Sequence, residues 1–480
     1  MVQDLLMERL TRICWVDLRA LALLRMALGG LILADLWVRV QDFSAFYTSS
    51  GVLPASFLIR SQVASQYLDL YRHCDTPLRA GGLFFFQAGV ALALIAGYRT
   101  RLSTVISWYL LASLHRRNVL LLDAGDLELK LVLFWSIFLP MGARWSWDAR
   151  RHSNEVANIC ASAASAAYLL QIGFIYFFAA AMKSDPVWRV NGDALFYALS
   201  IDQYSTGLAQ FLMNYPSFLR PPTFMALALE FSVLFAFCSP WRNAHCRLVI
   251  LIALALYHLS MAALFHFGLF QPICLAMLLG LLPLWLRDPP ETVAVSERGR
   301  LPRPLSALIL ASLVLIFWQN AGYLRVGAFP ERLGNVLRRF ALHQHWDIFT
   351  PHPLVQDGWF IIEATRADGA VVDLLRSGQP LSWEKPDSVA AQFPNERWRR
   401  YYQTLWSRTV PIYLSRYLWW ERERWNLYHT GNDRIVSLRF VFVEEYTNPP
   451  GQAPSLRTVI LRTFPDQTDS EAMVAPETMK

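Results

Sequence analysis

Residues 159–182 read ICASAASAAYLLQIGFIYFFAAAM, and no charged side chain interrupts them. A helix needs about 20 residues to cross the hydrocarbon core of a bilayer, so this stretch predicts a membrane-spanning helix. Eight further apolar runs lie near 17–39, 81–98, 102–118, 127–142, 222–239, 247–265, 267–286 and 304–322. The sequence therefore predicts an α-helical polytopic membrane protein with about nine transmembrane helices. Several runs are short or contain polar residues, which leaves eight or ten spans as alternatives.

The composition agrees with a membrane protein. Hydrophobic residues make up 54% of the 480 residues and charged residues 17%, against roughly 25% charged in an average soluble domain. Residues 1–322 hold 25 Lys and Arg against 19 Asp and Glu, whereas residues 323–480 hold 19 against 18. Basic residues gather on the inner loops of membrane proteins, so the net charge of +7 predicts no nucleic-acid partner.

The loop arginines predict the orientation in the membrane. With a cytosolic N-terminus, the inner loops gain Arg9, Arg12, Arg99, Arg101, Arg144, Arg150, Arg151, Arg242, Arg247, Arg287, Arg298, Arg300 and Arg303. The outer loops are poorer in basic residues for their length. The positive-inside rule therefore places the N-terminus in the cytosol and the chain after residue 322 outside.

A small extracytosolic domain is expected after the transmembrane domain of residues 1–322. Residues 323–464 combine strand-like alternation with an aromatic, Arg-rich stretch of helical spacing over 396–428, which predicts a mixed α/β domain. The strand-like segments are 359–365, 370–375, 435–443 and 457–463. Residues 465–480 are polar and are expected to be a disordered tail.

Lys183 is the first candidate for chemistry. The chain has 40 Arg and only 4 Lys, so a lysine directly after an apolar helix is exceptional. An ammonium group can lose its proton when it is desolvated, whereas a guanidinium cannot. Tyr176 lies seven residues earlier, on the same helical face. The alternative is a lysine that extends to the membrane surface as a simple anchor.

Two histidines are expected in the same outer leaflet as Lys183. His115 ends an outward-running span, and His258 lies in the outer half of another. We expect His115 and Lys183 to line one cavity, although each histidine could instead only form hydrogen bonds between helices. No metal site is predicted, because no span has an HxxxH pair and the six cysteines have no CxxC spacing. Glu230 either is structural or lines a cavity.

Three charged residues, Asp123, Asp126 and Lys130, are expected to stabilise the start of a helix. Asp123, Asp126 and Lys130 follow one another at positions i, i+3 and i+7. Residues at this spacing share one face of a helix, and acidic side chains stabilise a helix start. We therefore expect an ion-paired helix start.

The segment from Phe174 to Trp188, FIYFFAAAMKSDPVW, resembles the aromatic-small-Lys-x-Asp-x-x-Trp segment of vitamin K-dependent gamma-carboxylases and their bacterial relatives, the horizontally transferred transmembrane (HTTM) domain proteins. Three further stretches are similar: 24–35, 97–99 and 257–270. The resemblance covers roughly residues 17–285. It implies a bacterial inner-membrane protein. Met182 stands where the animal enzymes have a second lysine.

The resemblance also implies a function. In that family the matching lysine deprotonates reduced vitamin K, so Lys183, His115 and His258 become the predicted catalytic residues, and Tyr176 and Trp188 the predicted cofactor-binding residues. The expected activity is a quinol-linked, gamma-glutamyl carboxylase-like reaction in an outer-leaflet site, with reduced quinone as cofactor. The expected partners are membrane lipid, a quinol and an extracytosolic protein or small-molecule substrate. The alternative is a non-enzymatic membrane scaffold or lipid/quinone-binding protein.

Overall fold

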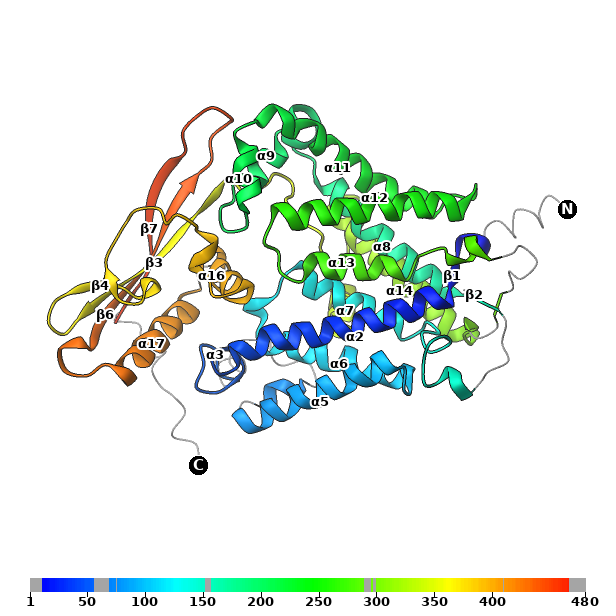
Figure 1. Ribbon diagram of the computed structural model, residues 1–480, viewed down its shortest axis with the longest axis horizontal. Coiled ribbons are helices and arrows are strands. Elements are labelled where there is room, and N and C mark those ends of the chain that lie inside the picture. The colour runs from blue at the N-terminus through cyan, green and yellow to red at the C-terminus, as the bar shows by residue number, and fades with distance from the viewer. Residues whose placement is uncertain are drawn as a thin grey trace.

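A computed structural model of the chain describes residues 11–55, 69–74, 76–151, 157–288, 295–296, 299–408 and 410–465. It shows a mostly helical protein with a small C-terminal sheet domain at one end of the helical bundle (Figure 1). The N-terminal strand pair lies at the opposite end. Of the predicted disordered tail, 466–480 falls outside the described residues.

Within the described part of the chain, six helices are long and apolar enough to cross a membrane. They are α2 (Leu18–Gln41), α5 (Pro77–Ala96), α8 (Ala163–Met182), α11 (Pro216–Phe237), α12 (Asn243–Leu264) and α14 (Arg303–Tyr323). Several such helices in one chain indicate a multi-pass membrane protein.

Each of the nine predicted spans contains a helix, but three of these helices are too short or too polar to count as membrane-spanning. They are α6 (Thr100–Arg117), α7 (Ala124–Ser136) and α13 (Phe270–Leu279). Helix α7 has 13 residues and rises about 20 Å, less than the roughly 30 Å of a hydrocarbon core. The expected count of nine spans is therefore not confirmed.

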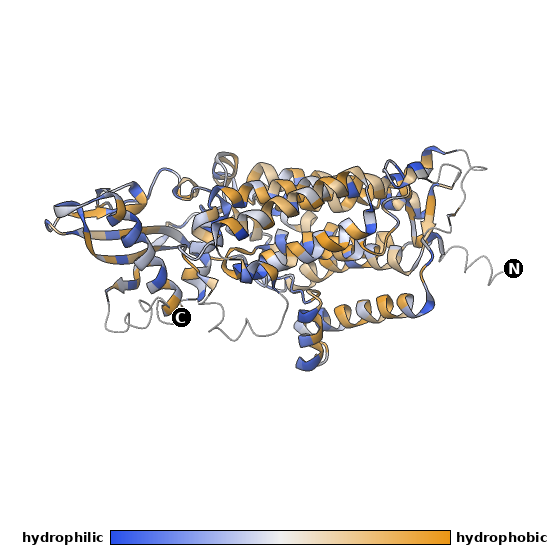
Figure 2. Cartoon of the chain, turned by 90° about the horizontal axis from the view of Figure 1, so that it is seen from below, coloured by the Kyte–Doolittle hydropathy of each residue, from blue (hydrophilic) through white to orange (hydrophobic). Residues whose placement is uncertain are grey.

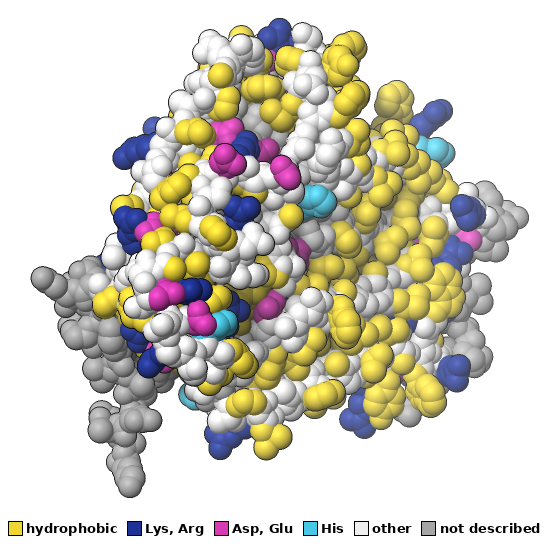
Figure 3. All heavy atoms as spheres, turned by 60° about the vertical axis from the view of Figure 1, so that its left-hand side comes forward, with side chains coloured by type: hydrophobic (Ala, Val, Ile, Leu, Met, Phe, Trp, Pro, Cys, Tyr) yellow, Lys and Arg dark blue, Asp and Glu magenta, His cyan; other side chains and the backbone are white. Residues whose placement is uncertain are grey.

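Helix α8 lies at the centre of the bundle. It is buried over most of its length and packs against α7, α11 and α14. The outer helices instead expose large apolar side chains such as Phe85, Met225, Phe235 and Val314. Figures 2 and 3 show hydrophobic residues along the bundle and over its flank, whereas charged residues gather toward the C-terminal domain. Such a continuous apolar flank is expected where lipid contacts a protein.

Polar side chains cap the first turns of α8 and α7. Ser162 and Ser165 form a capping box at the start of α8, and Asp123 and Asp126 form one at the start of α7. Such boxes satisfy backbone N–H groups that would otherwise lack partners. The capping box confirms that the acidic pair begins a helix. The expected ion pairing with Lys130 is not found among the described residues, because Asp126 pairs with Arg39 and Arg397 instead.

Short elements connect the helices. The strands β1 (Trp15–Asp17) and β2 (Ile159–Ala161) pair antiparallel. The short helices include α3 (Phe43–Tyr47), η2 (Leu70–His73), η3 (Val119–Leu121), η4 (Ala149–Arg151), the π-helix η5 (Val187–Asn191), α9 (Ala194–Leu199), α10 (Gly207–Met213) and η6 (Leu284–Arg287). The connection between α8 and α11, residues 183–215, thus contains η5, α9 and α10.

The C-terminal domain is a five-stranded antiparallel sheet of order β5-β4-β3-β6-β7. Its strands are β3 (Gln356–Arg366), β4 (Val371–Asp373), β5 (Gln379–Pro380), β6 (Ile435–Tyr446) and β7 (Ser455–Phe464). The helices are α15 (Glu331–Arg339), α16 (Glu396–Arg408) and α17 (Pro411–Tyr428), with the short η9 (Leu374–Arg376), η10 (Ala390–Gln392) and η11 (Gly431–Asp433). The four predicted strand segments are confirmed.

The predicted helical stretch over 396–428 is two helices. Pro411 is the first residue of α17, a position where the missing N–H of proline does no harm. The aromatic residues of both helices pack on one sheet face, where Tyr402 and Tyr417 contact Phe440. On the other face Trp359 packs with Val389 in a separate apolar cluster. This packing places the N-terminal end of α16 against the bundle.

Candidate functional site

An apolar cavity of about 700 Å³ lies between α8, α11, α12 and α13, and the segment 346–349 borders it. Most of its wall is aliphatic or aromatic, including Ile175, Leu229, Met261 and Phe270. The polar side chains that line it include Glu128, Tyr176, Lys183, Glu230, Tyr257 and His258. A mostly apolar cavity with a few convergent polar groups is the usual form of a site for a hydrophobic small molecule.

Lys183 ends α8 and forms a buried ion pair. Its Nζ lies 2.7 Å from Oε2 of Glu230 on α11, and the two side chains are 4% and 6% exposed. Nζ also lies 3.4 Å from the carbonyl oxygen of Ala179 and 5.2 Å from the ring centre of Trp188. The lysine is therefore enclosed by protein and is not an anchor that extends into water.

A second polar pair lies in the same cavity. The hydroxyl of Tyr176 and Nε2 of His258 are 2.7 Å apart, while Nδ1 of His258 has no hydrogen-bond partner among the described residues. The hydroxyl of Tyr257 donates to Oε1 of Glu230 at 3.1 Å. Glu230 thus accepts from both Lys183 and Tyr257, and His258 keeps one free ring nitrogen for a ligand.

The cavity brings together four of the five predicted site residues: Tyr176, Lys183, Trp188 and His258. His115 is the exception, since it does not appear among the described residues that line this space. The prediction that His115 and Lys183 line one cavity is therefore wrong. The C-terminal ends of their helices do lie at the same end of the bundle, but their side chains enter different clusters.

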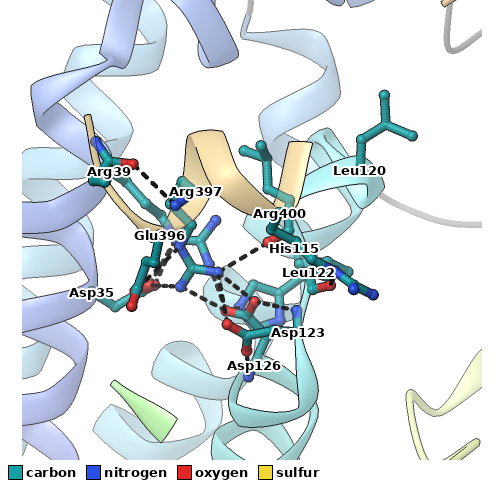
Figure 4. A network of polar contacts seen from close by, with 12 residues as sticks. Asp35, Arg39, His115, Leu120, Leu122, Asp123, Asp126, Glu396, Arg397 and Arg400 are labelled. Carbon is teal, nitrogen blue, oxygen red and sulfur yellow. Dashed lines mark hydrogen bonds and ion pairs between the residues drawn. The ribbon is translucent and has the colours of Figure 1, made fainter. Parts of the chain in front are cut away.

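His115 belongs to a buried ion cluster, which Figure 4 shows. Its Nε2 lies 3.3 Å from Oδ1 of Asp126. Arg39 contacts Asp35 and Asp126 through nitrogens at 2.8 and 2.6 Å from their oxygens. Arg397 from α16 contacts both of these carboxylates as well. Two acidic and two basic side chains therefore neutralise one another where α16 meets the helical bundle.

Ligand atoms of Asp35, His115 and Asp126 lie within 4.8 Å of one another, close enough to hold a metal ion. Both carboxylates, however, already accept hydrogen bonds from Arg39 and Arg397. The guanidinium groups supply the positive charge that a metal ion would supply. The cluster is therefore best described as an ion-pair network.

The sequence did not predict that Glu230 would pair with Lys183 or that Arg397 would enter the buried ion cluster. Glu230 is the single acidic residue in the run 222–239, and an isolated acid in a span is itself a signal of a buried partner or a site. The pairing of Arg397 had no comparable signal, because it is one of several arginines in the same segment, with Arg399 and Arg400 close by.

These features define a multi-pass membrane protein with a largely apolar cavity and a C-terminal sheet domain. No known family model, curated protein or solved structure matches the chain. The resemblance to the carboxylase family therefore depends on the quoted segments of sequence.

Proposed function

We propose that this protein is a quinol-linked, carboxylase-like enzyme of the HTTM type in a bacterial inner membrane, with Lys183 as general base. The observation that carries the proposal is the Lys183–Glu230 pair inside an apolar cavity. A lysine that acts as a base on a hydrophobic molecule must be reached through apolar space. Its ammonium group must also first lose a proton, because only the neutral amine can accept one. Both conditions are consistent with this arrangement.

The residues present fit a reduced quinone. The apolar wall suits a quinone ring and its isoprenoid chain, and Nδ1 of His258, which has no partner among the described residues, offers a contact to a ring oxygen. When bound, the quinol would supply, on reaction with O2, a base strong enough to remove a proton from the γ-carbon of a glutamate, which then takes up CO2. Tyr176 holds the other ring nitrogen of His258 and so orients the imidazole. Trp188 lies over the amine of Lys183 and shields it from water.

Proton transfer begins with the ion pair. Glu230 accepts the proton of the Lys183 ammonium across the 2.7 Å contact, which leaves a neutral amine and a carboxylic acid. In its neutral form, Nζ takes a proton from a hydroxyl group held in the cavity, so that the O–H bond breaks and an N–H bond forms.

The second candidate is a non-enzymatic lipid- or quinone-binding scaffold. One observation favours it: Lys183 is already satisfied by Glu230, Ala179 and the ring of Trp188. In that case the cavity holds a hydrophobic molecule and the ion pair joins α8 to α11.

Ligand analysis tests whether the cavity holds a quinone. Ala226 lines the cavity, whereas Ala228 on the same helix is exposed and lies outside it. Full-length protein is purified in detergent, and bound quinones are extracted and measured by mass spectrometry. We expect Ala226→Phe to lose the quinone and Ala228→Phe to keep it. Equal quinone content in both variants, or none in the unmodified protein, would contradict the proposal.

Lys183→Arg separates chemistry from binding. Arg keeps the positive charge but cannot release a proton at working pH. We expect this variant to be expressed normally and to fail in complementing a strain that lacks the gene. Full complementation by Lys183→Arg, combined with failure of Lys183→Ala, would refute the enzymatic function and favour the scaffold.

A further inference from the structure

A second hollow, of about 620 Å³, lies where the connection between α12 and α13 meets the C-terminal domain. Its wall includes Phe265, Phe267, Gln271, Phe393, Glu396 and Arg399. Phe265 also borders the cavity of Lys183, but the polar groups of the two spaces are different. The hollow joins residues of a candidate span to residues of the sheet domain.

Glu396 is the unusual group in this hollow. Its side chain is only 11% exposed, and neither carboxylate oxygen accepts a hydrogen bond from the described residues. The nearest cation, Nε of Arg397, lies 3.9 Å from Oε1, while the nitrogens at the tip of that side chain bind Asp35 and Asp126. A buried carboxylate without hydrogen bonds is costly, so a ligand that donates to it gains strongly.

A glycine makes space for the carboxylate of Glu396. Gly268 has φ +59°, and a Cβ atom at this position would overlap the carboxylate of Glu396. Residues other than glycine rarely adopt this backbone conformation. Glycine therefore allows the carboxylate of Glu396 to lie against the backbone of the α12–α13 connection.

Hydrogen-bond donors lie in the same hollow. Nε2 of Gln271 has no partner in the described part of the chain, although the side chain is 2% exposed. Arg399 follows Glu396 by one helical turn, and its guanidinium lies over the ring of Tyr204. The hydrogen bond from its Nη1 to the carbonyl oxygen of Gln203, at 3.4 Å, is long. The hollow is thus lined by a negatively charged hydrogen-bond acceptor, Glu396, and by a positively charged donor, Arg399, one helical turn later. The amide of Gln271 is a further donor.

We propose that this hollow binds a primary ammonium group joined by a short linker to an anionic group. Glu396 accepts hydrogen bonds from the ammonium, and Arg399 and Gln271 donate to the anion. Two sources have this chemistry: the headgroup of an aminophospholipid and a free amino acid. The apolar Phe265 and Phe267, at the end of the candidate span α12, suit a headgroup with an adjoining lipid tail. This site goes beyond the proposed function and does not depend on it.

Lipid binding to the full-length protein tests the proposal. Purified protein is mixed in detergent with phosphatidylethanolamine or phosphatidylcholine of identical acyl chains, and retained lipid is measured by native mass spectrometry. We expect phosphatidylethanolamine to bind about tenfold or more tightly, which corresponds to the loss of one charge-assisted hydrogen bond. Titration with phosphoethanolamine and glycine distinguishes the sources, because binding of these solutes without the lipid preference identifies a free solute.

Variants assign the preference to this hollow. Glu396→Gln removes the charge and keeps the shape, and we expect it to abolish discrimination between the two lipids and binding of the solutes. Glu331→Gln, an exposed carboxylate on α15, is the matched control and should change neither. Unchanged discrimination in Glu396→Gln, or equal affinity for all probes in the unmodified protein, would overturn the proposal.

A measurement without any variant covers the case in which Glu396→Gln does not fold. Stepwise N-methylation of phosphatidylethanolamine removes one N–H donor at a time and keeps the positive charge. If Glu396 accepts hydrogen bonds from the ammonium, affinity falls with each methyl group. Affinity that is independent of methylation, with no binding of the free solutes, would refute the site.

Discussion

Arg397 extends from the C-terminal domain into the helical bundle, where its Nη1 lies 2.5 Å from Oδ2 of Asp126. Its Nη2 also lies 2.7 Å from Oδ1 of Asp35 on α2. The two contacts join residues that are 271 and 362 positions apart in the chain. A buried ion cluster, and not only apolar packing, therefore fixes the sheet domain against the bundle.

Loss of this contact should destabilise the whole protein. Arg397→Met leaves Asp35 and Asp126 with one guanidinium instead of two, and breaking a buried pair costs about 3–5 kcal/mol. We expect a clear decrease in the thermal unfolding temperature in detergent. Arg376→Met, at an exposed position in η9, is the control and should have little effect. Equal shifts in the two variants would contradict a role for the buried cluster.

Lys183 and Glu230 should behave as an energetically coupled pair. Lys183→Met or Glu230→Gln alone leaves one charged group without its partner, at a cost of about 3–5 kcal/mol. The double variant removes both charges, so we expect its loss of unfolding free energy to be smaller than the sum of the single losses. A double-mutant cycle in detergent measures the coupling. Additive losses would show that the 2.7 Å contact contributes nothing.

The orientation of the C-terminal domain can be tested at Ser377, which is exposed beside η9. The arginine distribution of the loops predicts that this domain is extracytosolic. Ser377→Cys should therefore react with a membrane-impermeant thiol reagent in intact cells. The same variant with the cells opened controls for reactivity. Labelling only after the cells are opened would reverse the predicted topology.

Glu396 should make stability depend on pH. Burial raises the pKa of Glu396 to about 7, from 4.5 for an ordinary glutamate. The folded state therefore holds this proton more tightly than the unfolded state, so stability from this group is full below about pH 4.5 and is lost as pH rises to about 7. The total loss is about 3 kcal/mol.

Comparison of Glu396→Gln with the unmodified protein isolates this effect. Burial also raises the pKa of Asp357 to about 7, but that group is present in both proteins and its contribution cancels. We expect the Gln variant to be the more stable protein at pH 8 and the two to converge near pH 4.5. A difference in unfolding free energy that does not vary with pH would show that Glu396 does not titrate as stated.

Local patterns predicted the helices and strands because these depend on neighbours in the chain. Apolar runs were long enough for helices, as in α8, and alternation of apolar and polar residues marked β3 and β6. The aromatic, Arg-rich stretch was predicted to be helical, although its division at Pro411 was not. Lys183 stood out for a local reason as well, since lysine is rare in this chain and follows an apolar helix.

Only the tertiary structure decided which charges meet. The sequence by itself determined that Lys183, Glu230, His115 and Asp126 lie at or near helices of a membrane protein. It could not show that Lys183 pairs with Glu230 while His115 lies beside Asp126. The reason is physical: partner choice between buried charges depends on how helices rotate and pack against one another, and that is settled by contacts between residues far apart in the chain.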